Sequence, residues 1–218
     1  MRKVILLGSI SFLISQYLPT LASNKQPIKR ESFVQLCQRR ESLPRSTKHT
    51  IDGMLKSVGT KSCIKANTTI IAMGSISLKR RGITDLSPLA NFPNLTDLGL
   101  SDNQISDLRP LSSLTKLTTL DLTNNKITDL KPLATLTNLG DLYLNRNQIT
   151  DVKPLANLTD LTTLYLVKNR ISDVRPLANL RNLQRLELRG NKVTEKDCPF
   201  NKTMCNKVYN IDIKQEQE

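Results

Sequence analysis

Leucines recur along the central part of the chain at a fixed step of 22 residues. The stretch 117–138 reads LTTLDLTNNKITDLKPLATLTN, and the same order of apolar and polar positions restarts at Leu139 and, in the other direction, at Leu95. A period between 20 and 50 residues indicates repeats that stack on their neighbours. The pattern therefore predicts a solenoid. Its six units begin at Met73, Leu95, Leu117, Leu139, Leu161 and Leu183.

Within each unit, a short segment alternates apolar and polar residues. In the second unit, Leu98 and Leu100 alternate with Asp97, Gly99 and Ser101. A period of two residues describes a short strand with one buried face. We therefore expect one strand per unit, with the polar positions exposed on the concave face of the solenoid.

Three further positions recur after each strand. An Asn stands where the chain turns inward, and its amide can satisfy backbone groups that the turn leaves unpaired. An Asp stands three residues before a Pro, and its carboxylate can accept from the amides that open the next turn. The Pro-Leu-x-x-Leu that follows leaves room for a short 3₁₀ turn. The predicted columns are Asn103, Asn125, Asn147, Asn169 and Asn191; Asp85, Asp107, Asp129, Asp151 and Asp173; and Pro88, Pro110, Pro132, Pro154 and Pro176.

The order L-x-x-L-x-L-x-x-N-x-I-x-D-L-x-P-L-x-x-L resembles the leucine-rich repeat, and its 22-residue form with Pro-Leu is similar to that of bacterial internalins. Five successive units keep the Asp, the Pro and the following Leu. The resemblance implies an α/β solenoid, a leucine-rich-repeat horseshoe of low curvature with a parallel concave β-sheet. It also implies 3₁₀ turns on the convex side, a helical N-terminal cap and a secreted bacterial protein.

The first 22 residues read as a signal peptide. Arg2 and Lys3 precede an apolar run from Val4 to Ile14, and Thr20-Leu21-Ala22 forms a small-x-small cleavage site. An uncleaved membrane anchor is the alternative, but the apolar run is too short to cross about 30 Å of hydrocarbon. We therefore expect residues 1–22 to be removed, no transmembrane anchor, and a secreted or periplasmic protein.

The segments around the repeats (73–194) are expected to cap the stack. Residues 23–72 predict a helical N-terminal cap, with one helix over 32–40 and a second from about residue 46 to Gly59, because apolar residues fall on one face at helical spacing. Repeat stacks need such polar-faced caps to stay soluble. Residues 195–218 are expected to form a C-terminal cap and a polar tail.

Four cysteines stand in the two caps. Four cysteines allow three pairings. A stack of more than 100 residues separates the two groups, so position selects Cys37–Cys63 and Cys198–Cys205. Export makes these pairs disulfides and not metal ligands or reactive thiols.

Positive charge is concentrated ahead of the repeats. The chain holds 32 Lys and Arg against 19 Asp and Glu, and more than half of the excess on the exported form lies between Ser23 and Ile70. A basic surface attracts polyanions and anionic membranes without reading sequence. A polyanion site is one interpretation, and a soluble basic cap is the other. The same choice applies to the convex basic stripe, which consists of Arg109, Lys131, Lys153 and Arg175.

The residues that could bind a ligand lie at the outward positions of the strands, because the repeated residues only build the scaffold. Tyr143 and Tyr165 fall side by side in adjacent units, with charged residues around them. This composition matches interface hot spots, although cross-strand tyrosines that only shield the sheet would give the same pattern. The predicted ligand-binding residues are Asp97, Asp121, Asp141, Tyr143, Arg146, Tyr165, Val167, Lys168, Glu187 and Arg189.

No set of catalytic residues accompanies this surface. The single histidine, His49, lies in the cap, and no Gly-rich phosphate loop or metal-ligand spacing is present. We therefore predict a non-enzymatic protein–protein binding module that uses its concave face, needs no cofactor or metal, recognises no specific nucleic acid and is a monomer. The alternatives are a basic polyanion or cell-envelope binder and an accessory structural domain.

Overall fold

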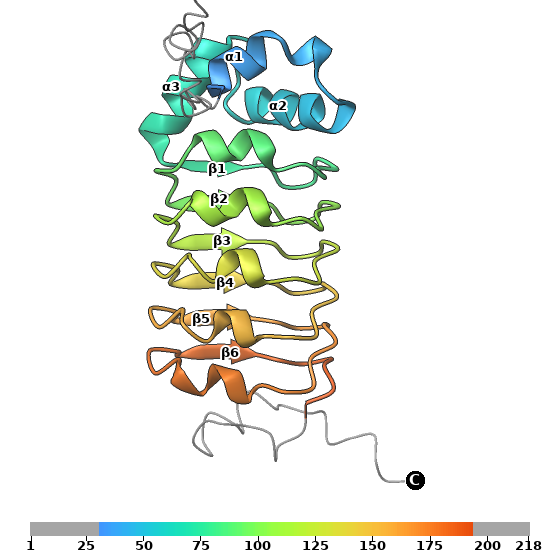
Figure 1. The fold of residues 1–218 in the computed structure, drawn as a ribbon, viewed down its shortest axis with the longest axis vertical. Coiled ribbons are helices and arrows are strands. Elements are labelled where there is room, and N and C mark those ends of the chain that lie inside the picture. Colours follow the sequence, from blue (N-terminus) through green and yellow to red (C-terminus); the bar gives the residue numbers. More distant parts are fainter. Residues whose placement is uncertain (1–30, 194–218) are drawn as a thin grey trace, which may run out of the picture. The chain divides into compact units, whose positions relative to one another are not determined.

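The structure of this protein, a computed structural model, describes residues 31–193. In this part of the chain, three α-helices precede six parallel strands that alternate with 3₁₀ helices (Figure 1). The predicted signal peptide (1–22), the C-terminal cap (195–218) and the Cys198–Cys205 pair lie outside the described residues.

Two of the three helices correspond to those expected in the N-terminal cap. Helix α1 (Phe33–Gln38) begins at Ser32, whose side chain and that of Gln35 form a capping box, and a 3₁₀ turn (Arg40–Ser42) follows it. Helix α2 (Arg45–Ser57) begins directly after Pro44, because proline tolerates a helix start but not a helix interior.

The third helix, α3 (Cys63–Met73), is absent from the sequence-based prediction. It begins at Ser62, whose hydroxyl accepts from the amide of Lys65, and it ends at Gly74, which has a φ of 62°. Three apolar residues of this helix are buried, and three large apolar side chains face outward. The buried set is Cys63, Ala66 and Ile70, and the exposed set is Ile64, Ile71 and Met73. Apolar residues on both sides of the helix hide the one-sided pattern on which the prediction depends.

One disulfide joins the first and third helices. Cys37 and Cys63 are bonded with their Cα atoms 5.7 Å apart, and both side chains are buried. The bond therefore closes a covalent loop of the cap that contains α2.

Six three-residue strands form a single parallel sheet in chain order. Each strand pairs with the next at a constant offset, so Leu98 lies opposite Leu120, and Leu120 opposite Leu142. This register confirms the solenoid. The strands are β1 (Ser75–Ser77), β2 (Asp97–Gly99), β3 (Thr119–Asp121), β4 (Asp141–Tyr143), β5 (Thr163–Tyr165) and β6 (Arg185–Glu187).

The convex side consists of short 3₁₀ helices, as the Pro-Leu segments predict. Each has its proline in the first turn, where the missing N–H leaves no bond unmade. The Asp ahead of it accepts from the amide two residues on, as Asp129 does from Lys131 at 2.9 Å. The helices that follow the first five strands are Ser87–Asn91, Arg109–Ser113, Lys131–Leu133, Lys153–Leu155 and Arg175–Asn179.

A continuous apolar core runs from Phe33 in α1 to Leu188 after β6. In the third unit, every recurring Leu or Ile is at most 1% exposed. These residues are Leu117, Leu120, Leu122, Ile127, Leu130, Leu133 and Leu136. Because each unit packs only on its neighbours, stability is a sum of interfaces along the stack.

The recurring Asn residues tie each unit to the one before it. The Nδ2 group of Asn125 donates to the carbonyl oxygens of Leu100 and Leu122, both at 3.0 Å, and its Oδ1 accepts from the amide of Ile105 at 3.0 Å. Asn103, Asn147, Asn169 and Asn191 repeat the arrangement. The column is thus structural, as expected. The column stops at Arg81, which occupies the Asn position of the first unit and whose backbone amide donates to Oδ1 of Asn103 at 3.1 Å.

Candidate functional site

The sheet register places six of the ten predicted binding residues in two adjacent rows on the concave face. One row runs through Asp97, Thr119, Asp141, Thr163 and Arg185. The other contains Asp121, Tyr143, Tyr165 and Glu187 in successive strands. Six of the ten predicted residues therefore lie close together on β2 to β6.

Tyr143 and Tyr165 form the centre of this surface. Their rings meet edge to face, with centroids 5.3 Å apart and an interplanar angle of 89°. Both side chains are half-buried, and the concave position of Thr163 is only 8% exposed. Edge-to-face contacts stabilise aromatic pairs beyond the area they bury, so the two rings hold each other in a defined orientation.

The electrostatic surroundings of Tyr143 reflect both rows. Burial raises the pKa of its hydroxyl, and three neighbours raise the pKa further while one opposes the shift. The three are Asp141, Tyr165 and Asp121, and the opposing residue is Arg185. The tyrosine pair thus lies where acidic and basic residues meet.

Arg146 and Lys168 lie at the edge of the sheet, in a column with an unusual backbone. Their φ angles are 55° and 56°, in the left-handed region, and Asp102, Asn124 and Gly190 occupy the same place in neighbouring units with φ between 56° and 73°. Both residues are predicted to bind a ligand because of their charge, and the prediction does not include this conformation. An Asp, an Asn and a Gly at the equivalent positions are the signal that could have revealed it.

The third outward position of each unit is less uniform than expected. Val167 is half-buried, and Arg189 is exposed and pairs with Glu187 at 3.3 Å. Ser101, expected to be outward-facing, is only 3% exposed, and its hydroxyl makes no hydrogen bond within residues 31–193. Ser101 therefore contributes little to a binding surface, whereas Val167 and Arg189 remain accessible.

Acidic and basic side chains are unevenly distributed along the concave face. The strands β2 and β3 and their turns carry Asp97, Asp102 and Asp121, and Asp102 is held by Arg80 at 3.2 Å and by Asn124 at 2.9 Å. The hydrogen bond from Asn124 is the main cause that lowers the pKa of Asp102. The later strands and turns carry four cations against Asp141 and Glu187. The four are Arg146, Lys168, Arg185 and Arg189.

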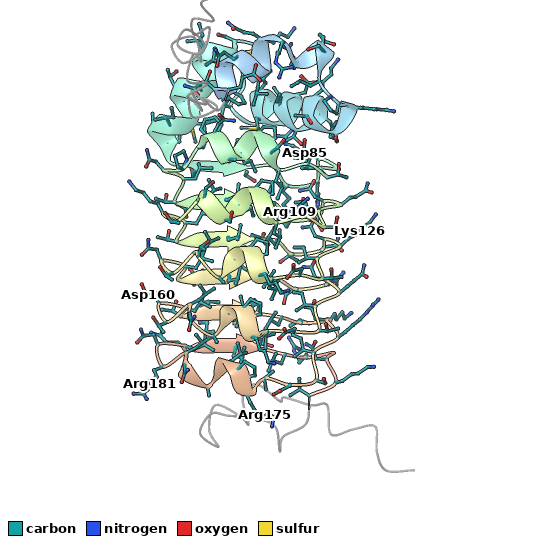
Figure 2. The ribbon with its side chains drawn as sticks, in the orientation of Figure 1. Asp85, Arg109, Lys126, Asp160, Arg175 and Arg181 are labelled. Carbon is teal, nitrogen blue, oxygen red and sulfur yellow. A yellow bond between two sulfur atoms is a disulfide. The ribbon has the colours of Figure 1, made fainter. Side chains whose placement is uncertain are left out.

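The convex basic stripe is partly neutralised by its own repeats. Figure 2 labels its two arginines. The guanidinium of Arg109 lies 2.7 Å from Asp107, and that of Arg175 lies 2.8 Å from Asp173. These contacts lower the pKa of Asp107 and lower that of Asp173 to about 2. Lys131 and Lys153 complete the stripe and are exposed. An anionic ligand would compete with carboxylates for half of this stripe.

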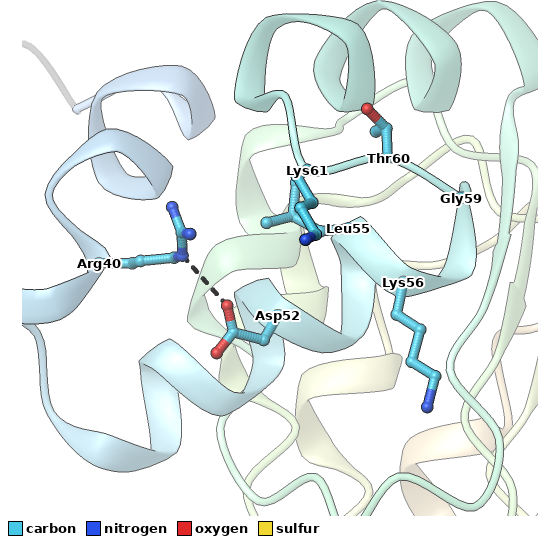
Figure 3. A pocket seen from close by; sticks show the side chains of 7 residues that line it. All are labelled: Arg40, Asp52, Leu55, Lys56, Gly59, Thr60 and Lys61. Atoms are coloured by element: carbon cyan, nitrogen blue, oxygen red, sulfur yellow. Dashed lines mark hydrogen bonds and ion pairs between the residues drawn. The ribbon is translucent and has the colours of Figure 1, made fainter.

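The basic cap contains an open hollow of about 640 Å³ beside α2. Within it, Arg40 bonds to Asp52 at 3.1 Å, and Lys56 points away from this pair (Figure 3). Its remaining lining residues are Leu55, Gly59, Thr60 and Lys61. One of its three cations is therefore already paired.

His49 is exposed at the start of α2 and contacts the carbonyl oxygen of Arg81. No group of three or more His, Cys, Asp or Glu within residues 31–193 could hold a metal ion. None of the helices in that same range is long and apolar enough to cross a membrane.

A family model described as "Leucine Rich repeats (2 copies)" matches residues 93–135, 115–157, 137–174 and 159–201. Among curated proteins, none matches the chain. An internalin C2 from Listeria monocytogenes is 31% identical, with a TM-score of 0.48, over 66% of this chain and 84% of that chain. A second Listeria monocytogenes internalin, inlF, is 28% identical, with a TM-score of 0.47, over 67% of this chain and 57% of that chain. The leucine-rich-repeat ectodomain of a plant receptor kinase from Arabidopsis thaliana is 26% identical, with a TM-score of 0.46, over 50% and 14%.

Proposed function

The chain belongs to the leucine-rich repeat family, and from this premise we propose that it is a non-enzymatic module that binds another protein through its concave sheet. The observation that carries the proposal is the edge-to-face pair of Tyr143 and Tyr165, which are half-buried in the middle of a half-buried row on the concave face. Aromatic residues framed by charged ones dominate the binding energy of many interfaces.

The two tyrosines make a suitable anchor because each ring orients the other. A side chain that is already ordered loses little conformational entropy when a partner binds. If the rings only shielded the sheet, they would be expected to lie over apolar neighbours. Instead, they lie beside Asp121, Asp141 and Arg185, and this mixed polar setting is typical of a protein-binding surface.

The disulfide supports the proposed compartment. Disulfides persist in oxidising environments and are rare in the cytosol, so the Cys37–Cys63 bond favours a secreted or periplasmic protein. We extend the proposal to the domain plan: a signal peptide in 1–22, a cap in 23–72, repeats in 73–194 and a C-terminal cap with Cys198–Cys205 in 195–218. A monomer without cofactor is part of the same proposal.

A polyanion or cell-envelope binder is the second candidate, and an accessory structural domain is the third. The exposed lysines of the convex stripe, Lys131 and Lys153, favour the second. Such an attraction is sequence-blind and weakens as salt screens it. The response to salt therefore separates the first two candidates.

Affinity capture with the immobilised protein, from the medium and envelope in which it occurs, tests the proposal. We expect a protein partner that stays bound at high salt and is lost with the double variant Tyr143→Ala/Tyr165→Ala. The matched control is Lys131→Ala/Lys153→Ala on the convex side, which should retain the partner. The proposal would be contradicted by a partner that still binds the double tyrosine variant and is released at high salt.

A further inference from the structure

Three cations occupy left-handed backbone positions in the column at the edge of the sheet, and the first of them, Arg80, is ion-paired at 3.2 Å. Arg146 and Lys168 hold φ angles of 55° and 56°. In this left-handed region a side chain with a Cβ crowds the backbone, and Gly, Asn and Asp tolerate it better than long side chains do. The same chain uses Asn124 and Gly190 at the equivalent positions, so the fold does not require a cation there.

No contact within the described chain explains the choice of these residues. Inside residues 31–193, the side chains of Arg146 and Lys168 make no ion pair or hydrogen bond, whereas Asn124 at the equivalent place donates to Asp102 at 2.9 Å. Both cations are exposed. When a strained backbone conformation is not compensated by a contact within the protein, a contact with a ligand can explain why it is retained.

The chain leaves room for Lys168 to extend along the sheet edge. A Cβ built on Gly190 would lie 3.1 Å from the Cγ of Lys168. A larger residue at position 190 would therefore push against the lysine stem. The lysine can lie across the last described repeat, near Arg189, whose carbonyl oxygen accepts from the Lys168 amide at 2.7 Å.

Together these residues form the basic end of a surface with two poles. Within residues 31–193, three cations beside the tyrosine pair make no ion pair: Arg146, Lys168 and Arg185. Glu187 lies in the same part of the sheet and is paired with Arg189 at 3.3 Å, while Asp97 and Asp121 lie on β2 and β3. A partner that fits this surface must present negative charge to the turns after β4 and β5. It must not present negative charge to β2 and β3, where like charges would repel it.

We propose that Arg146 and Lys168 receive an acidic segment of the protein partner, with an apolar residue of that segment placed on Tyr143 and Tyr165. This inference rests on the proposed function and names the partner's chemistry. A short run of carboxylates can contact the two cations without reaching the acidic residues of β2 and β3. A long polyphosphate or sulfated chain does not, because its charge would continue past the tyrosines onto Asp121 and Asp141.

Isotope-labelled protein titrated with synthetic peptides, followed by NMR of its backbone amides, tests this assignment. The probe is a dodecapeptide with four consecutive glutamates followed by two leucines, and the matched peptide has glutamine in place of each glutamate. We expect the glutamate peptide to shift the amides of 143–146 and 165–168, and the glutamine peptide to bind more weakly. The variant Arg146→Asn/Lys168→Asn should weaken glutamate-peptide binding at least about tenfold, because two charge-assisted contacts are lost.

The same variant has a second readout. Because Asn suits the left-handed region better, its thermal midpoint should rise by about 2 °C or more. The charge-matched control Lys116→Asn/Arg181→Asn removes two exposed cations with ordinary φ angles. It should leave the thermal midpoint unchanged and the peptide affinity within about twofold of that of the original protein. Gained stability with lost binding is the pattern expected of strain retained for recognition.

Three results would overturn the assignment: equal weakening by the two double variants, shifts only at amides outside 143–146 and 165–168, or no binding of the glutamate peptide. Tighter binding of inorganic polyphosphate at the same amides would overturn it in favour of a polyanion. Each of these results leaves the proposed function standing if capture of a protein partner still depends on Tyr143 and Tyr165. Loss of that dependence is the separate failure of the proposed function.

Discussion

The hydroxyl of Thr47 on α2 donates to the carboxylate of Asp85 in the first repeat, with 2.6 Å between Oγ1 and Oδ2. The other oxygen of Asp85 accepts from the amide of Ser87 at 2.8 Å, as the equivalent Asp does in the later repeats. The hydroxyl of Thr50 donates to the carbonyl oxygen of the same Asp85 at 2.7 Å. The cap therefore docks on a residue that every repeat needs for its own turn.

We expect Thr47→Ala to weaken the contact between the N-terminal cap and the first repeat. The lost hydrogen bond to an ionised carboxylate is worth about 1.5–3 kcal/mol, and Asp85 keeps its bonds to Ser87. Urea unfolding measures the change. The control is Thr68→Ala on α3, because that hydroxyl bonds only within its own helix. Equal stability of the two variants would contradict a docking role for Thr47.

Replacing Leu122 by Ala should destabilise the protein by about 2–5 kcal/mol, the range for buried leucines. Leu122 is fully buried in the middle of the stack, so the lost interface divides the repeats on either side of it. Proteolysis should then cut the protein near the third unit. Thr119→Ala, on the outer face of the same unit, is the control. Resistance equal to that of the unmodified protein would show that the buried ladder is wrongly assigned.

Loss of the side-chain amide of one recurring Asn should lower the free energy of unfolding by about 1–3 kcal/mol. Asn125→Ala leaves the amide of Ile105 without a partner, while the carbonyl oxygen of Leu100 keeps its bond from Asn103. The exposed Asn138, which makes one bond to the carbonyl oxygen of Thr115 at 2.7 Å, supplies the matched control Asn138→Ala. Hydrogen exchange of the Ile105 amide should accelerate only in Asn125→Ala. An unchanged exchange rate would contradict the assigned contact.

Reduction of the Cys37–Cys63 bond should lower the free energy of unfolding by about 3.5 kcal/mol in the chain-entropy model, given the 26-residue separation of the two cysteines. Urea unfolding with and without reductant measures this loss. The variant Cys37→Ala/Cys63→Ala serves as the control, since any remaining effect of reductant in it comes from other cysteines. If that variant responded to reductant as strongly as the unmodified protein, the assigned stabilisation would be wrong.

The carboxyl group of Asp173 should titrate with a pKa of about 2, well below its ordinary value of 3.8, because Arg175 donates to it. A depressed pKa in the folded state means that the contact stabilises the fold above about pH 3.8 and that this contribution disappears as pH falls toward 2. The group is exposed, so solvent screening keeps the stability effect small. Carboxyl NMR should report the low pKa directly. Arg175→Ala should raise it, whereas Lys126→Ala, on a different edge of the stack (Figure 2), should not.

Much of the scaffold follows from the order of residues, because a repeat makes the same local and neighbouring contacts in every unit. The strand positions, the Asn column and the Asp-Pro turns could be read from Leu120, Asn125 and Asp129 and their equivalents. The rows of the candidate site follow for the same reason. Once the register is constant, Tyr143 must lie beside Tyr165.

Other features depend on contacts between segments that have no common pattern. Helix α3 is absent from the prediction because its exposed Ile64 and Ile71 mask its buried side. The attachment of Thr47 to Asp85 needs two segments 38 residues apart to meet. Periodicity places Arg146 and Lys168 on the surface. Their left-handed backbone and the absence of a partner for either side chain within residues 31–193 emerge only when the turns are closed against the next repeat. Local periodicity thus specifies the stack, and packing between neighbouring turns specifies which of its surface charges are left free to bind.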